Sequence, residues 1–288
     1  MQKSKTLRLI YPQWQGGMNP NYFLGSHILK QILPKGKSEE IEVPVSENFN
    51  ENYLKDNINN PDILIKQLQM AYSILEIKNP DKIITIGGDC SVSQSSFDYL
   101  HGKYKDKKMG VLWIDAHPDI STPKDFEHEH AMIMGNLLGD GASQFAKIVK
   151  NPFKYEQLMY AGLIKKKCLP YENKYLEEKK IKFSTPEDLI KDNSIIVNWI
   201  KEMGFEVILI HLDVDVMNPT QFRSLLCNEP NLPTPDYAIG EFDVKKVVSI
   251  VCDVQKVCNV VGFTIAEYLP WDIINIQKEF CKIDIFNE

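Results

Sequence analysis

The sequence predicts a single-domain α/β fold with a mostly parallel sheet. Short apolar runs alternate with segments whose apolar residues recur at helical spacing. The short runs are apolar throughout, which is typical of parallel strands that helices cover on both faces. The alternation continues across the polar stretch 34–60 and the proline-rich stretch 227–237. Neither stretch therefore indicates a linker, and we expect one domain over residues 1–288.

Each expected element has its own local signal. The strands are short runs rich in β-branched residues, and they cover residues 7–11, 82–86, 109–114, 158–161, 207–212 and 260–266. Asp62 caps the first predicted helix, and Asn79-Pro80 ends it. A Ser-Thr-Pro start signal precedes a helix over about 187–203, and an apolar stripe indicates another helix over 244–257.

Composition excludes several classes of protein. The 288 residues are 43% hydrophobic and 25% charged, which argues against a disordered, collagen-like or coiled-coil chain. Lys and Arg number 33 against 39 Asp and Glu, and a net charge of −6 disfavours nucleic-acid binding. No apolar run approaches the roughly 20 residues that span a bilayer. Six cysteines without a CxxC pair, and an N-terminus without a signal-like apolar core, predict a cytoplasmic protein with no membrane partner.

Polar residues follow four of the predicted strands. These motifs are Gly87-Gly88-Asp89-Cys90, Asp115-Ala116-His117-Pro118-Asp119, Asp213-Val214-Asp215 and Glu267. Ligands bind at the carboxyl ends of parallel strands, so we expect the four motifs to share one site. Alternate residues of an extended segment point the same way, which brings Asp115, His117 and Asp119 together and gives Asp213 and Asp215 the same spacing.

The acidic motifs predict a metal site. Four carboxylates in one place repel one another, and a divalent cation relieves that repulsion. Carboxylates with one imidazole suit a hard or borderline ion such as Mn²⁺, and two ions bridged by shared carboxylates could hold a hydroxide. A single Asp after a strand is usually a cap or turn residue. A D-x-H-x-D motif and a D-x-D motif, each directly after a buried strand, favour the metal site.

At these residues the chain resembles the ureohydrolase (arginase/agmatinase) family. The resemblance rests on four blocks in the family's order, namely Gly87-Gly88-Asp89, Asp115 to Asp119, Asp213-Val214-Asp215 with Asn218-Pro219, and Glu267-Tyr268-Leu269-Pro270. It implies a three-layer α/β/α domain with about eight strands, and two Mn²⁺ ions per chain. It also implies hydrolysis of the guanidino or amidino group of an arginine-like small molecule, which releases urea or a related product. The family's habit further implies a homo-oligomer, either a trimer or a hexamer.

The resemblance also implies a role for each matched acidic or histidine residue. Asp115 and Asp213 would bridge the two metals. His117 and Asp215 would bind one metal. Asp119 would bind the other metal and accept a hydrogen bond from the bridging hydroxide.

Cys90 departs from the family pattern, because the family usually has His at this position. Thiolate is a softer ligand than imidazole and adds negative charge, but a metal lowers the pKa of a thiol and recruits the thiolate. We therefore expect Cys90 to complete the ligands of the first metal. If Cys90 does not ligate, one metal per chain is expected. The same Cys occurs in the branch of the family that hydrolyses N-hydroxyarginine, which makes that compound an alternative substrate.

Two further residues are predicted to take part in the chemistry. Glu267 would pair with the planar guanidinium of the substrate through two charge-assisted hydrogen bonds. His130-Ala131-Met132 aligns with the family segment whose His shuttles a proton. His130 is therefore the candidate general acid, and its ordinary pKa of about 6.5 suits that task.

The remaining candidates concern substrate contacts and the core. Ser121 stands where the family commonly has the Asn that binds the substrate carboxylate, and His128 is a second candidate contact. The alternative is that His128 and His130 are a solvated pair on a surface loop. The lysines at 165–167 are expected to be a solvated edge, or else to favour an anionic substrate group. His211, on the same side of its strand as Asp213 but deeper, is expected to form hydrogen bonds in the core, and a metal role is the alternative.

Three functions fit these residues. The first is guanidino hydrolysis, for which arginine, agmatine, N-hydroxyarginine, formiminoglutamate and guanidinobutyrate all carry the reactive group. The second is a catalytically silent family member that acts as a binding or assembly module, which Cys90 and the altered loop would favour. The third is amide hydrolysis of the deacetylation type, which Asp213, Asp215 and Glu267 disfavour because they complement a cation.

Overall fold

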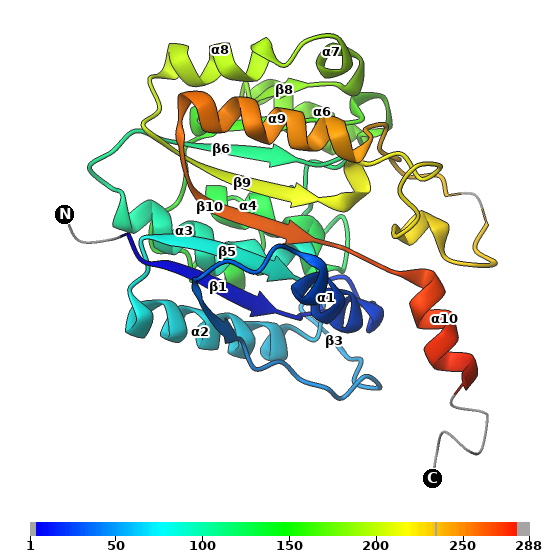
Figure 1. Cartoon of the computed structure of the whole chain (residues 1–288). Coiled ribbons are helices and arrows are strands. Elements are labelled where there is room, and N and C mark those ends of the chain that lie inside the picture. Colours follow the sequence, from blue (N-terminus) through cyan, green and yellow to red (C-terminus); the bar gives the residue numbers. More distant parts are fainter. Residues whose placement is uncertain (1–3, 234, 281–288) are drawn as a thin grey trace.

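The protein folds around one eight-stranded sheet, seen in a computed structural model that describes residues 4–233 and 235–280 (Figure 1). The strand order is β2-β1-β5-β10-β9-β6-β7-β8, and every neighbouring pair is parallel. The α/β class, the parallel sheet of eight strands and the single domain are therefore confirmed. The extent of that domain over 1–288 stays a prediction, because residues 281–288 lie outside the described part.

All six predicted strands are present, each within one residue of its expected bounds. The sheet consists of β1 (Thr6–Tyr11), β2 (Glu39–Glu42), β5 (Lys82–Gly87), β6 (Met109–Ile114), β7 (Leu158–Ala161), β8 (Lys182–Ser184), β9 (Val207–Asp213) and β10 (Asn259–Ala266). A separate antiparallel pair joins β3 (Leu54–Lys55) and β4 (Ile58–Asn59). The sequence analysis missed β2 and β8, the two edges of the sheet. Edge strands have one neighbour only and need no continuous apolar run, and β2 is indeed the charged segment Glu-Glu-Ile-Glu.

Helices cover both faces of the sheet, which confirms the three-layer arrangement (Figure 1). They are α1 (Asn21–Ile32), α2 (Pro61–Lys78), α3 (Ser93–Lys103), α4 (Ile133–Leu138), α5 (Ser143–Ala146), α6 (Pro170–Glu178), α7 (Pro186–Lys191), α8 (Ser194–Met203), α9 (Val244–Val257) and α10 (Trp271–Phe280). Helices α2, α3, α4 and α6 contribute to the core on one face, and α7, α8 and α9 contribute to the core on the other. Among the described residues, no helix is long and apolar enough to cross a membrane.

The helix predicted over 187–203 is wrong as one element, because α7 and α8 are separate. The break lies at Asp192 and Asn193. The Asp192 carboxylate accepts a hydrogen bond from the backbone N–H of Ser194 at 2.8 Å, and the Asn193 amide donates to Asp253 of α9 at 2.9 Å. Short polar side chains that bond to nearby backbone or to other elements compete with the helical hydrogen bonds, and here they end α7.

The predicted cap of α2 is also wrong. Asn60, in the left-handed conformation with φ of +48°, precedes the helix, and Pro61 begins it. Proline suits the first helical position because its missing N–H would have no helical partner there. Asp62 therefore lies inside the first turn, where its carboxylate pairs with Lys55 at 2.8 Å.

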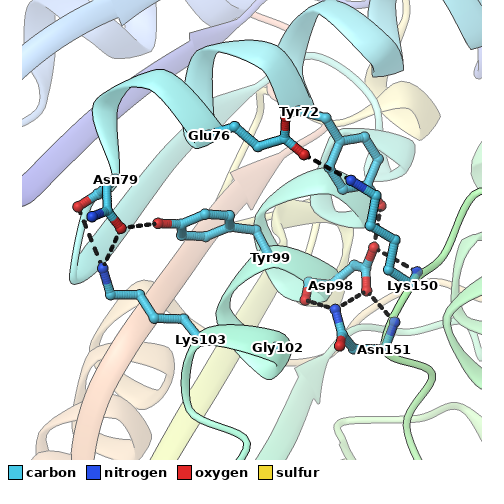
Figure 2. Close-up of a pocket in the computed structure, with 9 residues that line it drawn as sticks. All are labelled: Tyr72, Glu76, Asn79, Asp98, Tyr99, Gly102, Lys103, Lys150 and Asn151. Carbon is cyan, nitrogen blue, oxygen red and sulfur yellow. Dashed lines mark hydrogen bonds and ion pairs between the residues drawn. The ribbon is translucent and has the colours of Figure 1, made fainter.

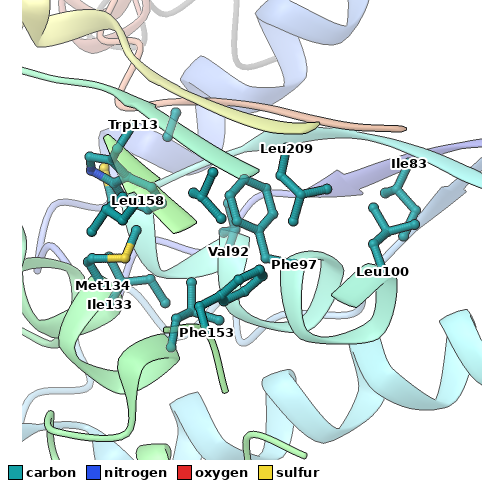
Figure 3. Packing of buried hydrophobic residues seen from close by; sticks show 14 of the residues in the cluster. Ile83, Val92, Phe97, Leu100, Trp113, Ile133, Met134, Phe153, Leu158 and Leu209 are labelled. Atoms are coloured by element: carbon teal, nitrogen blue, oxygen red, sulfur yellow. The ribbon is translucent and has the colours of Figure 1, made fainter. Parts of the chain in front are cut away.

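The core has two halves because successive strand residues point to opposite faces of the sheet. Along β6, Val111 and Trp113 pack on the α3 side, whereas Leu112 and Ile114 pack on the α8 and α9 side. Figure 3 shows the first half, where Phe97 of α3 lies among residues of the sheet such as Trp113 and Leu209. Burial on both faces explains why these strands are apolar throughout.

Candidate metal centre

The four polar motifs lie at the carboxyl ends of four neighbouring central strands. In the sheet these strands follow one another as β5, β10, β9 and β6. Their ends carry Cys90, Glu267, Asp213 and Asp115 respectively, and all four side chains are buried. A cavity of about 390 Å³ opens above them, and His117 is part of its lining. The sheet order thus brings together motifs that are far apart in the sequence.

Three groups of side chains in the described part of the chain have the geometry to hold a metal ion. Within each group one ligand atom per residue lies within 4.8 Å of the others; the groups are Cys90 with Asp115, Asp119 and His211, Cys90 with Asp213 and Glu267, and Asp115 with His117 and Asp215. All six predicted metal ligands belong to these groups. The structure adds His211, which the sequence analysis assigned to the core.

The first carboxylate of each acidic motif fixes its own turn. Asp115 accepts a hydrogen bond from the backbone N–H of His117 at 2.7 Å, and Asp213 accepts one from Asp215 at 2.7 Å. The other oxygen of Asp115 accepts from the Trp113 indole at 2.9 Å. These residues therefore have the capping role expected of an Asp after a strand, and they still present lone pairs to the cluster.

Asp119 is the candidate ligand whose geometry most clearly fits a cation. Its backbone has a φ of +50°, which is unusual for a residue other than glycine, and its Oδ2 is buried without a hydrogen-bond partner. A buried carboxylate oxygen left unpaired is costly, and strained conformations of this kind gather at functional sites. A divalent cation would give this oxygen a partner. The residues present therefore fit a metal ion.

The electrostatics of the cluster also fit a cation. Burial, and then the neighbouring carboxylates, raise the pKa of Asp119 and Asp213 well above its usual range and that of Asp115 to about 7. Burial alone would lower the pKa of His117, but Asp215 at 2.8 Å and Asp115 outweigh it and raise that pKa. A metal ion would balance the negative charge that raises these pKa values.

Cys90 belongs to two of these groups. Its thiol donates to Oδ2 of Asp213 at 3.0 Å, and its sulfur lies 3.3 Å from Nε2 of His211. Burial, and then the Asp213 carboxylate, raise the pKa of the thiol. The turn before it requires a glycine, because a Cβ on Gly88 would lie 1.7 Å from the carbonyl oxygen of Gln13. That close approach sets the direction in which Cys90 enters the cluster.

Glu267 and His130 form a pair beside the cluster. Oε1 of Glu267 lies 2.6 Å from Nδ1 of His130, and its Oε2 accepts from the Tyr22 hydroxyl at 2.6 Å. Burial opposes ionisation of both groups, but their attraction outweighs it, so that the pKa of Glu267 falls to about 2 and that of His130 rises. Tyr22 comes from α1, and the sequence analysis did not find it because no motif connects it to Glu267.

The two predicted substrate contacts lie on the cavity wall. His128 lines the cavity with its ring 5.8 Å from the ring of His130, and burial lowers its pKa to about 4. The two histidines are therefore not a solvated surface pair. Ser121 forms a hydrogen bond with the hydroxyl of Tyr171 at 2.7 Å. Tyr171 and Glu172 line the same wall, and the sequence analysis missed both because the start of α6 carries only a capping pattern.

The lysines at 165–167 lie away from the cavity lining. Lys166 pairs with Glu241 at 3.3 Å and Lys167 with Asp236 at 2.8 Å. Lys165 donates to the side chain of Asn173. The expected solvated edge agrees with these contacts, whereas a role for these lysines in holding an anionic substrate group does not.

A second pocket, between α2 and α3, has a structural explanation. In Figure 2 its polar side chains point toward one another. Asp98 accepts hydrogen bonds from the Tyr72 hydroxyl at 2.6 Å and from the backbone N–H groups of Lys150 and Asn151 at 2.9 and 2.6 Å. The Lys150 ammonium donates to Glu76 at 2.7 Å. These bonds fasten the loop before β7 to α2 and α3.

Comparison with known proteins places this site in a family. Two curated arginases are similar in sequence, one from Staphylococcus aureus (strain COL), 25% identical over 154 residues, and one from Entamoeba histolytica, 27% identical over 144 residues. The match to the first covers 50% of this chain and 49% of that protein, and the match to the second covers 48% of each. The chain thus spans about half the length of these relatives.

Solved structures of similar fold extend over most of the chain. An arginase from Entamoeba histolytica in complex with L-ornithine has a TM-score of 0.78 at 20% identity, covering 94% of this chain and 92% of that one. A formimidoylglutamase from Bacillus subtilis has a TM-score of 0.64 at 14% identity, covering 93% and 79%. At such identities the likeness shows a shared fold. The Arginase family model matches residues 37–272, and the chain therefore belongs to the arginase family.

Proposed function

We propose that this protein is a metal-dependent hydrolase that cleaves the guanidino or amidino group of an arginine-like small molecule and releases urea or a related product. The observation that carries the proposal is the gathering of six candidate ligands, four of which line one cavity, beside the carboxylate–imidazole pair of Glu267 and His130. The curated relatives named arginase support the same class of reaction.

The ligand set fits two divalent cations, for which Mn²⁺ is the proposed ion because carboxylate oxygens predominate. The residues that would hold them are Cys90, Asp115, His117, Asp119, Asp213 and Asp215. Cations held by these residues would lower the pKa of a bound water and so supply a hydroxide nucleophile near neutral pH. One ion per chain is expected if Cys90 does not ligate.

The chain's own residues would orient the substrate and move protons. Each oxygen of Glu267 has one partner already and keeps a lone pair, so the ionised carboxylate can accept two N–H bonds from a planar guanidinium. Nδ1 of His130 is engaged with Glu267, which leaves Nε2 to donate a proton to the leaving amine. Asp119 would bind one ion through its unpaired Oδ2, and its carboxylate would also accept a hydrogen bond from the nucleophile.

The cavity wall supports a substrate with a neutral or positively charged tail. Its described lining contains the carboxylates of Asp125 and Glu172 and neutral donors on Ser121 and His128, but neither lysine nor arginine. By charge complementarity, an ammonium tail as in agmatine suits this wall better than the two carboxylates of formiminoglutamate. N-hydroxyarginine is the alternative substrate, because Cys90, the residue that motivates it, belongs to the ligand cluster.

Metal content and hydrolysis together test the proposal. The protein would be purified with Mn²⁺, desalted and analysed for bound metal, and urea release would be measured on a panel of guanidino compounds. We expect two ions per chain and hydrolysis of at least one compound. Asp119→Asn should lose activity, whereas Asp81→Asn, which removes an exposed carboxylate that pairs with Lys103, should not.

A chain that binds no divalent cation and hydrolyses none of these compounds would instead be a silent binding or assembly module. Two further expectations follow from the family resemblance and the composition, namely a trimeric or hexameric assembly and a cytoplasmic location. Light scattering tests the first, since each chain contributes 33.1 kDa.

A further inference from the structure

The buried histidine of β9 belongs geometrically to the candidate metal centre. His211 lies two residues before Asp213, on the same side of the strand, and is fully buried. Its Nε2 lies 3.3 Å from the sulfur of Cys90. One ligand atom each from His211, Cys90, Asp115 and Asp119 lies within 4.8 Å of the others, and within the described ranges this is the one group that has four members.

The surroundings of His211 fix its ring in an orientation that suits a metal ligand. Oγ of Ser93 lies 2.8 Å from Nδ1, and the ring stacks on the Trp113 indole with centroids 3.6 Å apart and an interplanar angle of 8°. When Nδ1–H donates to Ser93, the lone pair of Nε2 is directed at the cluster. Histidines that bind metals commonly donate their other ring N–H to an oxygen in this way, which fixes both tautomer and ring orientation.

We propose that His211 is a metal ligand through Nε2 and binds the same ion as Cys90, Asp115 and Asp119. The inference rests on the proposed function, because it concerns the same centre. An imidazole adds a donor without adding negative charge to a cluster that already contains four candidate carboxylate ligands. It also gives the Cys90 thiolate a neighbouring nitrogen donor from another strand, so that the ion would join the turn after β5 to the middle of β9.

This assignment makes the two ions chemically different. Cys90 and His211 supply sulfur and nitrogen to one ion, whereas the group of Asp115, His117 and Asp215 is richer in oxygen. Thiolate and imidazole favour Co²⁺ and Zn²⁺ over Mn²⁺ more strongly than carboxylates do. The first equivalent of Co²⁺ should therefore bind at Cys90 and His211.

The competing role for His211 is that of a positioning residue. In that case its ring holds the Cys90 sulfur by a hydrogen bond and never contacts the ion. Both roles would affect activity, so activity does not distinguish them. The number of imidazoles bound to the ion distinguishes the two roles.

X-ray absorption on protein loaded with one equivalent of Co²⁺ gives that number. The protein would carry His117→Asn, so that an imidazole signal does not come from the other predicted histidine ligand. One sulfur and one imidazole on the same ion are expected. Sulfur without imidazole, or neither, would overturn the inference. This measurement leaves His211 itself unchanged and does not depend on a variant of that residue folding.

Calorimetric Co²⁺ titration of His211→Asn in the otherwise native chain provides the second readout. Loss of this ligand should weaken binding of the first ion by at least about a hundredfold, a larger effect than loss of an outer-shell partner. The control is His101→Gln, which alters another imidazole, one that stacks on Phe153 with centroids 4.0 Å apart outside the cluster. If His211→Asn binds two ions as tightly as His101→Gln, the inference is wrong but the proposed function stands. If the native chain binds no ion, the proposed function is wrong as well.

Discussion

Among single residues, Glu267 and His130 form an ion pair that is largely shielded from solvent. Burial disfavours the charged form of both groups, yet their attraction across 2.6 Å lowers the pKa of Glu267 and raises that of His130. A protonated imidazole with one free nitrogen is what a general acid needs. The proton-donating role proposed for His130 therefore depends on Glu267.

Glu267→Gln tests this dependence. Without the carboxylate, burial becomes the dominant influence, and the pKa of His130 should fall relative to the native protein. NMR titration of the imidazole nitrogens in metal-free protein measures the change directly, and Asp81→Asn is the control. An unchanged pKa of His130 in Glu267→Gln would contradict the assignment.

Asp115 predicts how stability depends on pH in the metal-free protein. Its pKa rises on folding to about 7, because burial and Asp215 disfavour the charged form. A carboxyl whose pKa is raised by folding binds more protons in the folded state, so its contribution to stability is lost as pH rises from about 4 through about 7.

Urea unfolding in the presence of a chelator should therefore show this contribution fading between about pH 4 and about pH 7. Asp115→Asn should flatten that part of the profile, since the amide does not titrate. Saturating Mn²⁺ should reverse the trend, because a bound cation favours the ionised carboxylate. Identical profiles for the native chain and the variant would contradict the prediction.

At the scale of elements, the turn after β5 depends on one close backbone contact. A Cβ on Gly88 would lie 1.7 Å from the carbonyl oxygen of Gln13, and neither backbone can move without disturbing the sheet. The side chain of Asp89 strengthens the same turn, since it accepts hydrogen bonds from the backbone N–H groups of Ser91 and Gly17, each at 3.1 Å. Asp89 is thus a structural residue of the motif, although it is buried close to the candidate ligands.

Gly88→Ala should destabilise the protein by more than about 4 kcal/mol, a loss that signals a specific steric fault. Gly36→Ala is the matched control, because its Cβ would meet only Ser38 at an ordinary contact distance of 3.5 Å. Chemical unfolding measures both. A loss of about 1 kcal/mol or less in Gly88→Ala would show that the turn can relax.

At the scale of the whole molecule, the cavity is built from segments that only the complete fold unites. Its floor comes from the central strands, and its wall includes the loop at 121–131 and the start of α6. Glu172 lines this wall while one of its oxygens accepts from the backbone N–H of Leu169 at 2.7 Å. The Tyr171 hydroxyl on the same wall interacts with this carboxyl as well, so a substrate tail would meet Glu172 together with Tyr171.

Agmatine and guanidinobutyrate form a matched pair of substrates for this wall, because their tails carry opposite charges. We expect a higher kcat/KM for agmatine. Glu172→Gln keeps the capping acceptor and should reduce the preference by about tenfold, which corresponds to about 1.4 kcal/mol. Glu241→Gln, on an exposed acid that pairs with Lys166, should leave the ratio unchanged. An equal ratio of kcat/KM values in the native chain and in Glu172→Gln would contradict the role of Glu172 in binding a positively charged tail.

Sequence patterns alone predicted the central strands and the residue types of the candidate centre. Both are local: a buried parallel strand must be apolar, and alternate residues after it share one side, as Asp115 and His117 do. The edge strands and the break between α7 and α8 escaped prediction because their residues carry weak or competing signals. Sequence patterns therefore predicted which residues gather at the centre. They did not predict all the contacts that each of these residues makes.

Those neighbours come from segments that are far apart in the sequence and meet only in the folded chain. Tyr22 bonds to Glu267 across 245 positions of sequence, and His211 meets Cys90 across 121. No local pattern predicts such contacts, because they depend on the order of strands in the sheet and on which helix packs beside their ends. The spacing of residues along a strand is fixed by backbone geometry, whereas the packing of the whole core determines which strands become neighbours.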